Sequence, residues 1–159
     1  GPLWLSAALG TAGAAANLVA MTRWWQHGVG KEPMLWVLFA GFGCTAAGVW
    51  LYGLLLALAP QFLSAAVHLI AVGGIGVLTV GMMTRTALGH TGRALSAPRG
   101  MPAAFALMLA AAAARFASVL LPMAYDALVI TSGLCFAAAL GLFAVRFGPW
   151  LIRPRADGG

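Results

Sequence analysis

Five apolar stretches of about 20 residues each decide what this sequence can fold into. They cover residues 3–21, 34–59, 62–84, 102–121 and 127–147. A helix needs roughly 20 residues to cross the apolar core of a bilayer. Helices are expected rather than an open sheet, because sheet edges would leave backbone groups unpaired in lipid. The sequence therefore predicts an all-α fold, a polytopic membrane bundle of five transmembrane helices in a single domain over residues 1–159.

The composition is typical of a chain that is solvated by lipid. Hydrophobic residues make up 62% of the 159 residues and charged residues only 8%, whereas soluble domains carry about 25% charged residues. Cys44 and Cys135 lie inside apolar stretches and are expected to be free thiols. The sequence opens on Gly1-Pro2 without an initiator Met, and we expect it to be part of a longer chain.

Lysine and arginine are distributed unevenly among the connections between the apolar stretches. With alternating helices, every basic residue outside Arg115 falls on one face: Arg23, Lys31, Arg85, Arg93, Arg99, Arg146, Arg153 and Arg155. Basic connections usually lie in the cytoplasm. The distribution therefore predicts an N-terminus outside and a C-terminus in the cytoplasm. It also accounts for the net charge of +6 without nucleic-acid binding.

Three polar side chains inside the apolar stretches are expected to lie in one layer of the membrane. His68 is seven residues from Gln61, and Arg115 is seven residues from Pro122. Both should lie roughly 10 Å below the non-cytoplasmic face, and Tyr52 falls at a similar depth. This layer could hold a heme, with histidine on the iron and arginine on a propionate. It could equally be a polar network that fixes helix packing.

The sequence "GHTGR", residues 89–93, follows the third apolar stretch. It is either a solvated cytoplasmic loop near lipid headgroups or a backbone nest that binds an anion. Its histidine, His90, cannot share a simple metal site with His68, because Arg85 alone is already about 25 Å from His68 along the helix. Met82 and Met83 are more typical of packing, although thioethers also bind Cu(I).

The glycines of the third stretch allow two interpretations as well. They permit close helix packing, or they clear space for a flat cofactor beside His68.

The segment "HLIAVGGIGVLTVGMMTRTALGHTGR", residues 68–93, resembles the signature of the NnrS family. Weaker agreement extends to "KEPMLWVLF" and to "RFGPWLIRPRADG" near the C-terminal end. The resemblance covers nearly the whole chain, but only the C-terminal part of the roughly twelve-helix architecture of the family. Its members are described as bacterial inner-membrane proteins that contain heme and copper. They are associated with denitrification and with resistance to nitric oxide and nitrosative stress.

The resemblance implies specific positions for cofactor binding. His68 and His90 match the two histidines of the signature, and Arg85 and Arg93 match its basic positions. Heme is the implied cofactor, with His68 as its axial ligand, and copper is allowed as a second one. Family members tend to read "LWVLHLGY" where this chain reads "LWVLFAGF". Phenylalanines then replace a histidine and a tyrosine, and a metal site that requires this histidine would be weakened here.

Two other functions are open on the sequence alone. Arg115 and the glycine-rich third helix could line the path of an anionic substrate in one half of a transporter. The chain could also be a non-catalytic membrane module, which packs against a second copy or against a missing N-terminal half. Catalysis is not indicated, because no nucleophile–base pair and no buried carboxylate is present in the sequence.

Overall fold

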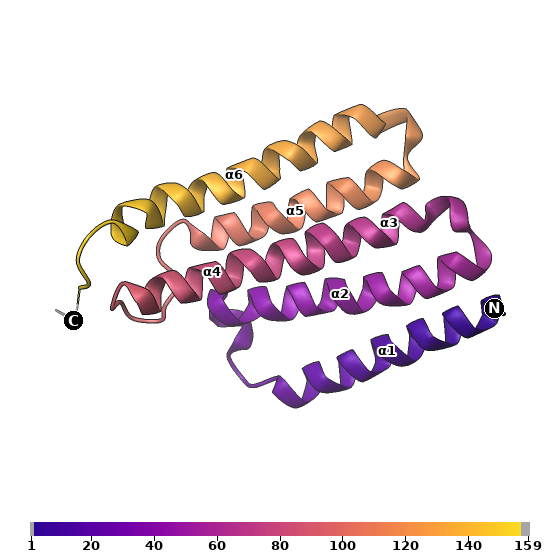
Figure 1. Ribbon diagram of the computed structural model, residues 1–159, viewed down its shortest axis with the longest axis horizontal. Coiled ribbons are helices and arrows are strands. Elements are labelled where there is room, and N and C mark those ends of the chain that lie inside the picture. Colours follow the sequence, from indigo (N-terminus) through magenta and orange to yellow (C-terminus); the bar gives the residue numbers. More distant parts are fainter. Residues whose placement is uncertain (1, 157–159) are drawn as a thin grey trace.

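The computed structural model describes residues 2–156, and in this range the chain forms five long helical rods. The rods are α1 (Leu3–Trp24), α2 (Pro33–Leu58), a third rod built from α3 (Leu63–His68), η3 (Leu69–Gly76) and α4 (Val77–His90), then α5 (Met101–Leu120) and α6 (Tyr125–Leu151). They lie side by side in chain order and alternate in direction (Figure 1). Each is long and apolar enough to cross a membrane, and the described residues contain no strand. The predicted all-α membrane bundle is confirmed.

The two ends of the bundle differ in charge. The α1–α2 and α4–α5 connections lie at the same end as the C-terminus, and the N-terminus lies at the other end with the two short turns (Figure 1). The first of these ends, called the arginine-rich end below, carries Arg23, Lys31, Arg85, Arg93, Arg99, Arg146 and Arg153. That this end faces the cytoplasm stays a prediction from the charge distribution.

Helices α1 and α2 approach each other closely where Gly10 of α1 faces Gly53 of α2. A Cβ atom added to Gly10 would lie 3.0 Å from the carbonyl oxygen of Val49 and 3.1 Å from the Cα atom of Gly53. The hydroxyl of Ser6 donates a hydrogen bond of 3.3 Å to the carbonyl of Gly53. Small residues let membrane helices approach to backbone contact, and this crossing positions the first rod.

The middle of the third rod is wound as a π-helix over Leu69–Gly76. Its glycines face neighbouring helices. A Cβ atom on Gly73 would lie 2.9 Å from the Cβ atom of Cys44 in α2 and 3.3 Å from that of Ala112 in α5. Gly74 faces the side chain of Thr45 in the same way. Of the two interpretations of these glycines, the structure supports close packing, because α2 and α5 occupy the space beside them.

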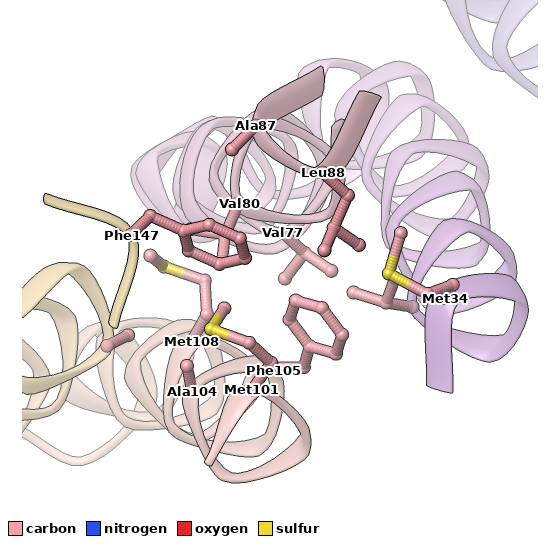
Figure 2. Packing of buried hydrophobic residues seen from close by; sticks show 12 residues of the cluster. Met34, Val77, Val80, Ala87, Leu88, Met101, Ala104, Phe105, Met108 and Phe147 are labelled. Carbon is pink, nitrogen blue, oxygen red and sulfur yellow. The ribbon is translucent and has the colours of Figure 1, made fainter. Parts of the chain in front are cut away.

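A hydrophobic cluster near the arginine-rich end holds the rods together. Phe105, Met108 and Phe147 are fully buried in it. Figure 2 shows Phe105 of α5 directed between α4 and α2, and Phe147 of α6 close to Met108 and Val80. The third rod thus lies at the centre of the bundle, where it contacts α2, α5 and α6.

Two helix ends differ from the predicted ones. The third span, predicted to end at residue 84, continues to His90, where the C-cap residue Thr91 and the left-handed Gly92 end the helix. Helix α6, whose span was predicted to end at residue 147, continues through Pro149 and ends at Leu151. Pro149 lacks the N–H for a helix hydrogen bond and crowds the carbonyl four residues before it, and the helix ends two residues later.

Candidate functional site

His68 and Arg115 lie on neighbouring helices, in the third rod and in α5. His68 is the last residue of α3, Arg115 lies in α5, and these two helices contact each other. Both side chains are partly buried, and they are close enough for the charge of Arg115 to act on the imidazole. The constant rise of a helix is what allowed the sequence to place them at one depth.

The guanidinium of Arg115 is incompletely satisfied. Its Nη1 atom is buried and has no hydrogen-bond partner among the residues that the structure describes. The nearby Ser118 hydroxyl donates to the backbone carbonyl of Arg115 at 2.8 Å and does not provide a partner for Nη1. A buried donor without a partner costs about 1–3 kcal/mol, and more when it is charged. The Nη1 atom of Arg115 is therefore available to donate a hydrogen bond to an anionic group in this layer.

A cavity of about 520 Å³ adjoins this pair on the side away from the arginine-rich end. Its wall consists of Ser64, Ser118, Val119, Pro122, Tyr125 and Asp126. Ser64 lies one helical turn before His68, and Ser118 lies one turn after Arg115. The His68–Arg115 pair therefore lies next to the cavity without forming its wall.

Tyr52 forms no hydrogen bond with His68 or Arg115 among the described residues. Its side chain is 41% exposed on α2. Depth alone placed it in the set, and depth does not specify the direction in which a helix presents a side chain.

The "GHTGR" sequence is the C-terminal cap of α4. Gly92 has a left-handed φ of 67°. The N–H groups of Thr91, Gly92 and Arg93 donate to the carbonyls of Ala87, Gly89 and Leu88 at 3.1, 3.2 and 3.0 Å. This is the pattern of a Schellman cap. The interpretation as a backbone nest is wrong, because these N–H groups already have helix carbonyls as partners.

Substitutions of the two glycines in this cap, Gly89 and Gly92, should have different effects on stability. We expect Gly92→Ala to lower the free energy of unfolding by about 1 kcal/mol, because alanine at a left-handed φ is strained. Gly89 is helical, and a Cβ atom there would meet nothing within 4 Å. Gly89→Ala should therefore be neutral or stabilising. Thermal unfolding in detergent measures both variants, and equal losses would contradict the assignment of the cap.

His90 lines a second cavity, of about 540 Å³, between α4 and α6. Met82 and Met83 share this wall and are 49% and 38% exposed. The sequence favoured a packing role for these methionines, but their side chains lie on a cavity surface outside the core. The described residues contain no group of three His, Cys, Asp or Glu side chains that could hold a metal ion. The donors available here are one imidazole and two thioethers.

The two arginines of the signature lie at the arginine-rich end. Arg85 is exposed on α4. Arg93 places its guanidinium carbon 4.1 Å from the centroid of the Trp150 ring, and Arg146 shares the same ring. Sequence analysis did not connect Trp150 with these arginines. The i, i+4 spacing of Arg146 and Trp150 on one helix was the signal available for half of this contact.

The two phenylalanines that depart from the family pattern pack against tryptophans of α1 and the residue after it. The ring of Phe39 lies 5.2 Å from that of Trp25, and the ring of Phe42 lies 5.7 Å from that of Trp24, both edge to face. Aromatic packing thus occupies the position where the resemblance expects a histidine.

Comparison with known proteins gives one family. The sequence model of the NnrS protein family matches residues 2–155, which is almost the full length of the chain. Searches of curated proteins and of solved structures found no match. Because this match covers almost the whole chain, whose five apolar helices are long enough to span a membrane, the chain belongs to the NnrS protein family.

Proposed function

We propose that this protein binds heme within the bacterial inner membrane and takes part in the response to nitric oxide or nitrosative stress. Membership in the NnrS family supports the assignment. The single observation that carries it is the buried Nη1 atom of Arg115, which has no hydrogen-bond partner in the described chain and lies within electrostatic range of His68.

The residues of the layer suit heme better than they suit a packing network. A network that serves packing bonds its polar members to one another. Here no hydrogen bond joins Arg115, His68 and Tyr52 in the described chain. An imidazole is a common axial ligand of heme iron, and a guanidinium pairs with a propionate carboxylate. His68 would hold the iron, and Arg115 would orient the macrocycle through a propionate.

Bound heme would supply an iron that binds nitric oxide, and the chain would supply its surroundings. The packed glycines of η3 keep α2 and α5 against the third rod, and this packing fixes the orientation of His68. The serines and Asp126 make the adjoining cavity polar on the side that we predict to face outward.

Copper fits the second cavity by donor type. Thioether and imidazole ligands suit Cu(I), and Met82, Met83 and His90 line one wall there. Phe39 and Phe42 provide no ligands, so a copper site in this chain would depend on α4 alone.

Heme titration of the wild-type protein and of Arg115→Leu tests the proposal. Wild-type protein should develop a Soret band and contain iron by elemental analysis. Arg115→Leu should bind heme roughly 10- to 100-fold more weakly, from the loss of one charge-assisted bond. Without heme, the same variant should unfold at a temperature equal to or above that of the wild type, because it removes an unsatisfied buried donor.

Heme binding and heme-free unfolding of Arg115→Leu give opposite results for a heme site and for a packing network. A packing network predicts that Arg115→Leu destabilises the heme-free protein and that no Soret band forms in either protein. Wild-type protein that contains neither heme nor iron would contradict the proposed function.

A further inference from the structure

Trp150, in the last turn of α6, holds two arginine side chains at once. The guanidinium carbons of Arg93 and Arg146 lie 4.1 and 4.4 Å from the centroid of its ring. Each cation is attracted to the ring, but the two cations repel one another. Both distances end at the same ring, so the guanidiniums cannot be farther apart than the two distances combined. This Arg93–Trp150–Arg146 cluster therefore concentrates positive charge at one point of the arginine-rich end.

No carboxylate in the described chain neutralises the cluster. Glu32 is occupied as the N-cap of α2, where its Oε1 atom accepts from the N–H of Met34 at 3.4 Å. Asp126 lies in the first turn of α6, at the opposite end of the bundle. Two guanidiniums that are held against one ring, with no carboxylate partner among the described residues, form a site that an external anion would stabilise.

The guanidinium of Arg93 is held in place, and among the described residues most of its donors have no partner. Each guanidinium has five N–H donors. Arg93 donates one of them, through Nη1, to the carbonyl oxygen of Thr91 at 3.1 Å. The N–H of Ala156 donates to the same oxygen at 3.0 Å, which fixes the tail beside the cap of α4. The partly buried Arg93 therefore needs little further ordering to bind a ligand.

The positions of the helix ends predict that the cluster lies near the membrane surface. Helix α4 ends three residues before Arg93, and α6 ends one residue after Trp150. Tryptophans at helix ends are typical of the membrane–water interface, where lipid headgroups lie. Basic pockets between transmembrane helices on the cytoplasmic side bind anionic headgroups.

We propose that the Arg93–Trp150–Arg146 cluster binds the phosphodiester headgroup of an anionic phospholipid. Phosphate oxygens accept charge-assisted bonds from more than one guanidinium, and the planar fork of arginine matches their geometry. The cluster shares no residue with the His68–Arg115 layer, so the lipid site does not depend on the proposed heme function.

Native mass spectrometry of the full chain in neutral detergent tests this site. Dioleoyl phosphatidylglycerol is compared with dioleoyl phosphatidylcholine, which carries the same acyl chains without net charge. Wild-type protein should prefer phosphatidylglycerol. Arg93→Gln/Arg146→Gln should bind it roughly 30-fold more weakly, from the loss of two basic contacts. Arg153→Gln is the matched control, because this exposed arginine lies at the same end outside the cluster, and it should retain most of the affinity.

Three results would overturn the proposal. If phosphatidylglycerol affinity falls by the same factor per removed charge in the control and in the double variant, the lipid binds to diffuse positive charge at this end and not to the cluster. Displacement of the lipid by millimolar inorganic phosphate would indicate a site for the free anion. If the glutamine variant does not fold, Arg93→Lys/Arg146→Lys decides: it keeps both charges but loses the planar fork. The lysine variant should bind phosphatidylglycerol more weakly than the wild type, and unchanged binding would contradict the site.

Discussion

Protein purified with His68→Ala is expected to lose its Soret band, while its helical content stays that of the wild type. His68 provides the imidazole of the layer that contains Arg115, and heme iron in such sites is held by its axial ligand. The side chain is partly buried and forms no hydrogen bond within the described chain, so its removal breaks no polar contact of the fold. Absorbance at the Soret band relative to protein, together with circular dichroism, measures both expectations.

His27→Ala is the matched control for this loss. His27 is exposed in the connection after α1, at the arginine-rich end, and it should leave the Soret band unchanged. His90→Ala removes the second histidine of the signature from the cavity that it shares with Met82 and Met83. It should spare heme and lower bound copper in elemental analysis. Full heme occupancy in His68→Ala, with loss in His90→Ala, would exchange the roles assigned to the two histidines.

The number of spans and the depth of their polar residues could be predicted because each follows from distance along the chain. Apolar composition over about 20 residues specifies a span, and a constant rise specifies depth. His68 and Arg115 were paired in this way. Contacts that depend on the direction of a side chain around its helix could not be predicted. Tyr52 is exposed and has no hydrogen bond to His68 or Arg115 within the described chain, and the stacking of Arg93 on Trp150 joins residues 57 positions apart.

The cap of α4 shows a second limit of sequence reasoning. Glycines on both sides of polar residues indicate a loop, and "GHTGR" was predicted to be one. Gly89 and His90 continue the helix, Thr91 is its C-cap residue, and Gly92 has the left-handed φ. A Schellman cap and a loop use the same residue types, because both require a glycine at positive φ. The pattern alone could not decide how many of the preceding residues remain helical.

Close packing at η3 predicts a large loss of stability when one of its glycines is replaced by a β-branched residue. Gly73→Val should lower the free energy of unfolding by about 2–3 kcal/mol through overpacking. A Cβ atom at this position would contact the Cβ atoms of Cys44 and Ala112, on opposite neighbours of the third rod. Neither Cβ can rotate away, since each is fixed to its own backbone, so α2 or α5 must move. Thermal unfolding in detergent should show a midpoint lowered by about 5–10 °C.

Gly141→Val provides the comparison, because Gly141 also lies inside a long helix but has nothing within 4 Å of its added Cβ atom. Valine there changes only helix propensity, where it is comparable to or better than glycine. This variant should keep the midpoint of the wild type. A similar loss in both variants would mean that helix propensity, and not the approach of α2 and α5, explains the effect. Loss in Gly73→Val alone should also reduce heme binding, since the same packing orients the turn that carries His68.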